Sequence, residues 1–342
     1  MKTRNRIIIA ILAAIAVVCC VVVFNWLRDN KLPDFSQRTE LYVYPDTGSE
    51  SIRDTLLARA GVRWPRRLGK VFESHELDTY CKPGHYVVEP GMTAVYVTRM
   101  LNNGWQTPVK LVLSGTLRRR GDIARKIANQ MMVDSAEVRA AFEDKELLRE
   151  FGFTPKTAFA LFVPDTYEMY WTASVRDIFA KQFDAYEAYW TDSNIAKAQA
   201  LGLSQMQVSI LASIVSGETN YVPEMPKIAG VYLNRLRIGM KLQADPTVAF
   251  CYDYQVNRIY KKMLSVDSPY NTYKYEGLPP GPIYVPTRNS LDAVLNPDYG
   301  GGNLYFCADP SFNGSHRFAR TYSEHLRNAR AFQAALNKRK AK

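Results

Sequence analysis

A single carboxylate stands where an apolar helix is expected to end. The segment from Ser204 to Glu218 carries apolar residues at helical spacing, so one of its faces is predicted to be buried. Ser204, followed three residues later by Gln207, is the sequence pattern of a capping box that starts a helix. Gly217 and the residues after Glu218 continue a helix poorly. Glu218 is therefore predicted near the C-terminus of this helix, on or beside its apolar face.

This position would change the chemistry of the Glu218 carboxyl group. Burial disfavours the ionised form of a carboxylate, and the negative end of a helix dipole disfavours it further. A glutamate with a pKa raised in this way keeps its proton near neutral pH, as a general acid requires. The same spacing is typical of a glutamate that caps or salt-bridges an ordinary helix end, and spacing alone favours that second interpretation.

The amino-terminal residues are expected to anchor the chain in a membrane. Residues 7–27 form an almost unbroken apolar run that is too long for a signal-peptide core and has no small-residue cleavage site after it. We therefore expect a single retained transmembrane helix over residues 7–27, after a cytoplasmic tail of residues 1–6. Because Lys2, Arg4 and Arg6 precede the span, the rest of the chain is expected outside the cytoplasmic (inner) membrane.

The composition narrows the choice of ligands. The formal net charge of +11 is compatible with nucleic acid, but lipid headgroups and cell-wall polymers are the polyanions met outside that membrane. We therefore predict no nucleic-acid partner. The two short basic runs, at residues 118–120 and 338–340, are interpreted as solvated surface.

The cysteines and histidines indicate neither a metal nor a cofactor. The four histidines are scattered without metal-ligand spacing, so no metal and no cofactor are predicted. Cys81, Cys251 and Cys307 lie outside the span and lack CxxC spacing. At most one disulfide can form among these three, and the sequence does not assign its partners.

The pattern of elements after the span predicts an α+β fold. Residues 36–115 read as a small α+β unit, with strands near 41–44, 86–88 and 109–113 and helices near 51–60, 70–77 and 93–101. Residues 116–342 read as a larger, mixed α+β domain richer in helices. Its predicted helices cover 122–132, the stretch from 134 to 150, 175–190, 204–218, 226–237 and 323–336, and its strands lie near 161–167 and 304–306. Residues 242–247 and 276–283 are predicted as turns and loops, where function is often found.

Several motifs resemble, in order, the YceG-like family of MltG-type endolytic murein transglycosylases. They are FVPDTY (162–167), ASIVSGET (212–219), VYLNRLRIGMKLQADPTV (231–248), YNTY (270–273), GLPPGPI (277–283) and LYFCAD (304–309). The resemblance runs from about Tyr86 to the C-terminus. It implies a membrane-anchored lyase that cleaves the MurNAc–GlcNAc bond within nascent peptidoglycan strands. It also implies a LysM-like α+β subdomain over residues 36–115 and a catalytic domain over 116–342, with cell-wall synthases or division proteins as possible partners.

The same resemblance assigns roles to individual residues. The family's catalytic glutamate maps to Glu218, and the position two residues earlier, where many members carry another glutamate, is Ser216 here. Substrate contacts are implied for polar residues of the downstream motifs: Gln243, Asp245, Thr247, Asn271 and Tyr273. Each of these five residues has the alternative role of holding its loop in shape.

One carboxylate is enough for a lytic transglycosylase, whereas ordinary glycosidases use two. Glu218 would protonate the glycosidic oxygen and then deprotonate the C6 hydroxyl, leaving a 1,6-anhydro-MurNAc end. Asp245 or Glu276 could supply a second carboxylate, so a glycan hydrolase stays an alternative. A cell-wall-binding or scaffolding protein without catalysis is another.

Overall fold

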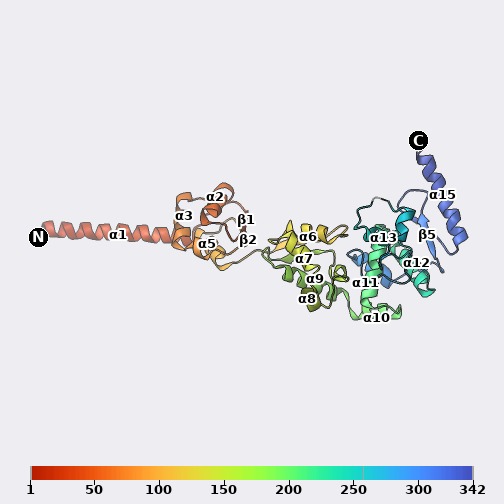
Figure 1. Cartoon of the computed structure of the whole chain (residues 1–342). Helices are drawn as coiled ribbons and strands as arrows, with labels where there is room; N and C mark the ends of the chain where they lie inside the picture. The colour runs from red at the N-terminus through yellow and green to blue at the C-terminus, as the bar shows by residue number, and fades with distance from the viewer. Residues whose placement is uncertain (1, 257, 341–342) are drawn as a thin grey trace. The chain divides into compact units, whose positions relative to one another are not determined.

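The computed structural model describes residues 2–256 and 258–340, which form two compact units (Figure 1). The first unit comprises residues 1–110 and 168–172, and the second comprises 111–167 and 173–342. The elements confirm an α+β fold that follows an amino-terminal apolar helix.

The amino-terminal helix is α1 (Lys2–Asn30), shown in red in Figure 1. Within its segment Arg4–Asn30, a window of 18 residues has a mean hydropathy of 3.5, and the segment is long and apolar enough to cross a membrane. The carboxylate of Asp29, near its C-terminal end, receives two hydrogen bonds from Arg67, at 3.0 and 2.6 Å to Oδ2. This ion pair joins the end of α1 to the helix that carries Arg67.

The rest of the first unit is a two-stranded antiparallel sheet packed with short helices. Strand β1 (Thr39–Val43) pairs with β2 (Gly84–Val88), with Leu41 opposite Tyr86. Alternate residues of β1 are buried, as expected of a strand with one face on a core. The helices are α2 (Ser49–Arg59), α3 (Pro65–Ser74), α4 (Leu77–Tyr80) and α5 (Ala94–Asn103).

The first part of the second unit differs from two sequence expectations. Strands β3 (Val109–Val112) and β4 (Thr166–Met169) form a two-stranded sheet, of which residues 111–112 and 166–167 belong to this unit. The helices of this part are α6 (Arg120–Ala128), α7 (Ser135–Ala141), α8 (Lys145–Glu150), the 3-10 helix η1 (Ala158–Leu161) and α9 (Val175–Tyr189). The strand predicted near 161–167 begins only at Thr166, since Leu161 ends the buried 3-10 helix η1 and residues 162–165 have no helical or strand structure. The stretch predicted as one helix to residue 150 is two helices, because Asp144 caps α8 by accepting hydrogen bonds from the N–H groups of Glu146 and Leu147.

The remaining elements build the part of the second unit that contains Glu218. They are α10 (Asp192–Ala200), α11 (Gln205–Glu218), η2 (Val222–Glu224), α12 (Met225–Arg237), α13 (Asp245–Cys251), η3 (Lys261–Ser265), α14 (Arg288–Leu295), the antiparallel pair β5 (Tyr305–Ala308) and β6 (His316–Ala319), and α15 (Tyr322–Lys340).

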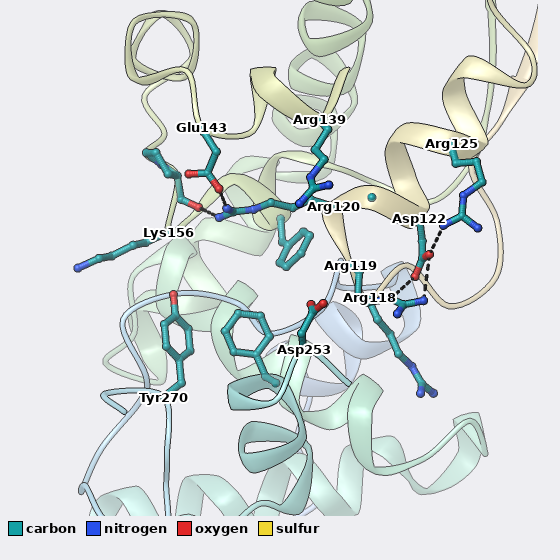
Figure 2. Close-up of a pocket in the computed structure, with 14 residues that line it drawn as sticks. Arg118, Arg119, Arg120, Asp122, Arg125, Arg139, Glu143, Lys156, Asp253 and Tyr270 are labelled. Carbon is teal, nitrogen blue, oxygen red and sulfur yellow. Dashed lines mark hydrogen bonds and ion pairs between the residues drawn. The ribbon is translucent and has the colours of Figure 1, made fainter. Parts of the chain in front are cut away.

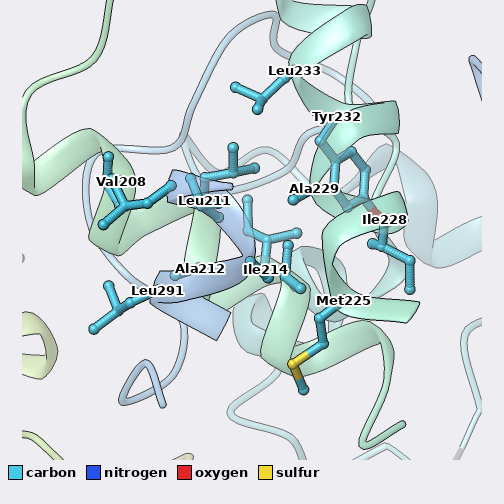
Figure 3. Packing of buried hydrophobic residues seen from close by; sticks show 14 of the residues in the cluster. Val208, Leu211, Ala212, Ile214, Met225, Ile228, Ala229, Tyr232, Leu233 and Leu291 are labelled. Carbon is cyan, nitrogen blue, oxygen red and sulfur yellow. The ribbon is translucent and has the colours of Figure 1, made fainter. Parts of the chain in front are cut away.

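A buried apolar cluster between α11, α12 and α14 is the core of this part. Figure 3 shows Leu211 and Ile214 of α11 facing Ile228 and Ala229 of α12, all fully buried. Gly230 lets the chain after α14 approach α12 closely, because a Cβ at this position would lie 2.1 Å from the carbonyl oxygen of Asp298. This core fixes the orientation of α11, whose last residue is Glu218.

Candidate functional site

Helix α11 positions Glu218 through a capped start, a buried middle part and a defined end. At its start, the Ser204 hydroxyl accepts a hydrogen bond from the Gln207 N–H (3.2 Å), and the Gln207 side chain accepts one from the Ser204 N–H (2.8 Å). The predicted capping box is therefore confirmed. The residues between Val208 and Val215 are buried, which holds the helix in place. At its end the backbone becomes extended at Thr219, so Glu218 is the last helical residue.

The Glu218 carboxyl group lies against a buried tyrosine. The hydroxyl of Tyr232, on α12, donates a hydrogen bond to Glu218 Oε1 at 2.5 Å. Tyr232 is 1% exposed and its ring meets that of Phe306 edge-on, so the phenol has little freedom to turn away. Glu218 itself is half-buried and lines two cavities.

Burial raises the pKa of Glu218 from its ordinary value of 4.5 to about 7. The negative charge of Asp245 raises it further, whereas the hydrogen bond from Tyr232 and the positive charge of Arg235 lower it. The raised pKa favours the protonated form of Glu218 near neutral pH far more than an ordinary glutamate would. The interpretation of Glu218 as an ordinary salt-bridged or capping residue does not fit this arrangement, because its side chain is engaged by a neutral phenol.

Two cavities share Glu218 and Asp245 as a common wall. The larger, of about 580 Å³, is also lined by Arg118, Tyr254 and Tyr284. The smaller, of about 280 Å³, is lined by further aromatic and polar side chains from α12, β5, α15 and the segments near residues 243 and 273: Tyr232, Arg235, Gln243, Tyr273, Tyr305, Phe306, Tyr322 and His325. A chain-like ligand that occupied both cavities would pass the carboxyl group of Glu218.

Gly217 allows the segment with Asp245 to approach Glu218. A Cβ on Gly217 would lie 2.7 Å from Cβ of Pro246 and 3.1 Å from Cε2 of Tyr284. Real atoms do not approach so closely, so any side chain at position 217 would push Pro246 and Tyr284 away. The start of α13 and the larger cavity therefore depend on the glycine beside the carboxylate.

The proline-rich segment, residues 277–283, is bonded to α11 through the hydroxyl of Ser213. Ser213 accepts a hydrogen bond from the N–H of Ile283 at 3.0 Å and donates one to the carbonyl of Ile210 at 2.6 Å. Gly281 touches another part of the second unit, since a Cβ there would lie 1.9 Å from the carbonyl oxygen of Lys156. Tyr284, which follows Ile283, is thereby placed in the wall of the larger cavity.

Three of the five predicted substrate contacts line a cavity with Glu218. Asp245 is exposed, and its Oδ1 accepts a hydrogen bond from the Tyr273 hydroxyl at 2.6 Å. Gln243 is exposed and has a left-handed backbone with a φ of 49°. Gln243, Asp245 and Tyr273 all line the smaller cavity.

The other two predicted substrate contacts are directed into the protein. Thr247 is 0% exposed, and its hydroxyl donates a hydrogen bond to the carbonyl of Ala244 at 2.7 Å. The same hydroxyl lies 2.9 Å from the hydroxyl of Thr272. Asn271 is also 0% exposed, and its amide donates to the carbonyls of Leu264 and Val266. In this structure the side chains of Thr247 and Asn271 are buried and bonded within the protein, which matches the alternative role of holding a loop in shape.

Sequence reasoning missed several residues of the site. Residues 242–247 were predicted as a turn, yet Asp245 and Pro246 begin helix α13, where the missing N–H of proline is harmless. Strand β6 and helix α14, which support the site from later in the chain, were not predicted. The aromatic lining and His325 come from segments distant in sequence, so no local spacing indicated them.

Arg235 is a structural residue that also borders the site. Its guanidinium donates to the carbonyl oxygens of Leu304 (2.7 Å) and Leu242. The neighbouring Asn234 donates to the carbonyl oxygens of Asn303 and Tyr299. These two side chains tie α12 to the chain before β5, and neither bonds the loop after Glu218.

The chain resembles proteins from three bacteria. It is 39% identical over 129 residues to an endolytic murein transglycosylase of Bacillus subtilis (strain 168), which covers 38% of this chain and 35% of that protein. It is 31% identical over 131 residues to an endolytic murein transglycosylase of Streptococcus pneumoniae serotype 2, covering 37% and 23% of the two chains. These matches thus span about a third or less of each relative.

The fold and the family are shown over a longer stretch. The crystal structure of a YceG-like protein from Listeria monocytogenes matches with a TM-score of 0.57 and 25% identity, covering 85% of this chain and 98% of that chain. The sequence pattern of the YceG-like family matches residues 41–331, which contain both cavities and every predicted site residue. The chain therefore belongs to the YceG-like family.

Proposed function

We propose that this protein is a membrane-anchored endolytic lytic transglycosylase of peptidoglycan, with Glu218 as its single general acid and base. The observation that carries the proposal is a carboxyl group with a pKa near 7 in the common wall of two cavities. The endolytic murein transglycosylases of Bacillus subtilis and Streptococcus pneumoniae, as partial relatives, support the substrate class.

The proposed reaction begins with protonated Glu218. A glycan strand occupies both cavities so that the MurNAc–GlcNAc bond lies at the carboxyl group. Glu218 gives its proton to the glycosidic oxygen, the bond to C1 of MurNAc breaks, and the GlcNAc hydroxyl leaves. The Glu218 carboxylate then takes the proton of the C6 hydroxyl, whose oxygen bonds to C1. The products are a 1,6-anhydro-MurNAc end and regenerated Glu218, and no water is consumed.

Other residues have supporting roles in this proposal. Tyr232 stabilises the Glu218 carboxylate after its proton has left, because its hydroxyl donates to Oε1. Gln243, Asp245 and Tyr273 offer polar groups to sugar hydroxyls in the smaller cavity. The aromatic rings that line both cavities suit the apolar faces of sugar rings.

A specific observation keeps a hydrolase as the second candidate. Asp245 lines both cavities beside Glu218, so a second carboxylate is within the site, whereas Glu276 is exposed and lines neither cavity. A hydrolase would use Asp245 to activate water. A binding protein without catalysis is the third candidate, and in that case the carboxyl group of Glu218 would serve no reaction.

The proposal also includes the placement of the chain. Helix α1 anchors the protein, with residues 1–6 in the cytoplasm, and the remainder lies outside the membrane, where peptidoglycan is found. Residues 36–115 are proposed as a LysM-like subdomain that grips glycan, and residues 116–342 as the catalytic domain. Reporter enzymes fused to the C-terminus, one active only inside and one only outside the cytoplasm, would test this orientation.

The decisive experiment analyses the products of the full chain in detergent acting on purified peptidoglycan. Mass spectrometry of the new ends distinguishes the candidates. Anhydro-MurNAc ends that disappear in Glu218→Gln support the lytic transglycosylase, and reducing MurNAc ends indicate the hydrolase. Intact glycan that still co-sediments with the protein indicates a binding protein.

A further inference from the structure

A third cavity in the second unit is lined by more cationic than anionic side chains. It has a volume of about 830 Å³, and Figure 2 shows the side chains that border it. Six of them are cationic and three are carboxylates, which gives a formal net charge of +3: Arg118, Arg119, Arg120, Arg125, Arg139, Lys156, Asp122, Glu143 and Asp253. The basic run at residues 118–120, interpreted from sequence as solvated surface, is therefore part of a cavity wall.

Internal ion pairs hold part of this wall in place. Asp122 accepts hydrogen bonds from Arg119 at 2.7 Å and from Arg125 at 2.9 Å. Arg120 pairs with Glu143 and also donates to the carbonyl of Pro155. These contacts use two of the three carboxylates, Asp122 and Glu143.

The other three cations have no such partner. Among the residues that the structure describes, Arg118, Arg139 and Lys156 form no ion pair with a carboxylate, and only Asp253 offsets their charge within the cavity. Positive charges lining a concave surface attract anions, because the low-dielectric walls concentrate their field. The net positive charge of the cavity therefore favours the binding of an anionic group.

Arg118 connects this basic cavity with the site of Glu218. Its side chain lines both the basic cavity and the larger of the two cavities that Glu218 lines. Its guanidinium lies over the rings of Tyr254 and Tyr284, at 5.7 and 5.2 Å from their centroids. The basic cavity and the larger cavity at Glu218 therefore adjoin at Arg118.

The chemistry of peptidoglycan limits which anion this would be. The sugars of a glycan strand are neutral where each lactyl carboxyl group forms an amide with a stem peptide. The carboxylates of the stem peptides are then the anions present beside every MurNAc. A pyrophosphate occurs only at a lipid-linked strand end, away from cuts made within the strand. A cavity adjoining the cleavage site therefore suits stem carboxylates better.

We infer that the basic cavity binds the carboxylates of the stem peptide next to the bond that is cut. This inference rests on the proposed function and adds to it a preference for strands that carry charged peptides. Arg139 and Lys156 line the basic cavity but neither of the cavities at Glu218. Substitution of these two residues therefore tests the preference for charged peptides without changing the lining of the cavities at Glu218.

The test compares the double variant Arg139→Gln/Lys156→Gln with the wild-type full chain in detergent. The substrates are peptide-bearing glycan and the same glycan after its carboxylates have been amidated with carbodiimide and ammonia. We expect kcat/KM of the variant to fall about tenfold or more on the charged glycan and to equal that of the wild type on the amidated one. Lys181→Gln/Lys197→Gln is the matched control, since it removes two exposed cations that line none of the three cavities.

Three results would overturn the inference. One is a variant that equals the control on both substrates, and another is a variant that is equally slow on both, which would mean a structural role. The third is a defect seen only on strands that retain their pyrophosphoryl lipid, which would assign the cavity to phosphate.

Failure of the proposed function gives a different result. If the wild-type chain cuts neither substrate, its co-sedimentation with insoluble peptidoglycan still tests the cavity. Amidation of the polymer should then weaken binding of the wild-type protein about tenfold and leave binding of the double variant unchanged. Equal sensitivity of both proteins to amidation would contradict the inference even without catalysis.

Discussion

The hydrogen bond from Tyr232 to Glu218 should set the pH at which the protein works. Because the acid form of Glu218 starts the proposed reaction, kcat/KM should fall as the pH rises through the pKa of about 7. Tyr232→Phe removes the donor that favours the carboxylate, so the pKa of Glu218 should rise. The acid form then persists to higher pH, and the alkaline limb of the profile of kcat/KM against pH moves to higher pH.

The size of this shift follows from the geometry. A hydrogen bond to a charged group contributes about 1.5–3 kcal/mol, and one pKa unit corresponds to about 1.36 kcal/mol. Water that enters from the cavities restores part of the lost bond, so we expect a shift of roughly one unit upward. Phenylalanine fills the same fully buried space, which avoids a packing defect.

A second variant should shift the limb in the opposite direction. Asp245→Asn removes a negative charge that raises the pKa of Glu218, so the limb should move to lower pH. Because Asp245 is exposed, solvent screens its charge and the shift should be about half a unit. The amide still has an oxygen that accepts the hydrogen bond from Tyr273.

The assay is the initial rate of strand cleavage between pH 5 and 9, at substrate concentrations low enough to give kcat/KM. Tyr189→Phe is the control, since it loses a hydroxyl bonded to Asp292 and does not touch Glu218. Shifts of Tyr232→Phe and Asp245→Asn in the same direction, or a limb unmoved by either, would refute the assignment of the limb to Glu218.

The remaining predictions concern packing and stability. Gly217→Ala should reduce cleavage at least tenfold and destabilise the second unit by about 1–3 kcal/mol, because the new Cβ displaces Pro246; melting and product assays measure both. Ser213→Ala should lower the free energy of unfolding by about 1–3 kcal/mol, because the N–H of Ile283 loses its partner, as denaturant titration would show. Glu218→Gln should raise that free energy above the wild-type value at pH 8.5. Ionisation of a group whose folded-state pKa is raised from 4.5 to about 7 costs up to roughly 3 kcal/mol, and the difference should vanish at about pH 3, below both values.

Matched variants separate these effects from general damage. Gly69 lies within α3, and Gly69→Ala places a Cβ in ordinary van der Waals contact with Arg53. This variant should leave the free energy of unfolding unchanged or raise it. Ser209→Ala removes a buried hydroxyl that bonds only within α11, so Ser213→Ala should be the more destabilising of the two. A stability gain of Glu218→Gln that is constant with pH would contradict the pKa argument.

Local patterns predicted the elements that carry their own signal. The capping box at Ser204, the apolar stripe of α11 and the breakers after Glu218 defined that helix and its end. In each case the physical cause lies within a few residues of its effect.

What the sequence could not predict depends on contacts between distant segments. The phenol of Tyr232 reaches Glu218 because α11 and α12 pack together, and its ring position depends on Phe306 of β5. Thr247 and Asn271 belong to family motifs yet point inward, since a polar residue in a loop has no spacing that tells inside from outside. The basic cavity joins residues 118–120 with side chains such as Asp253 from much later in the chain.

The common wall of the two cavities bears on the length of the substrate. A short oligosaccharide can fill the larger or the smaller cavity, but only a longer one fills both and holds its bond at Glu218. Binding energy from sugars remote from the bond can be used to orient it, so truncated substrates lose turnover as well as affinity. The turnover number should therefore increase with oligomer length until both cavities are occupied and then stay constant. The two cavities together would thus set a minimum length for an efficient substrate.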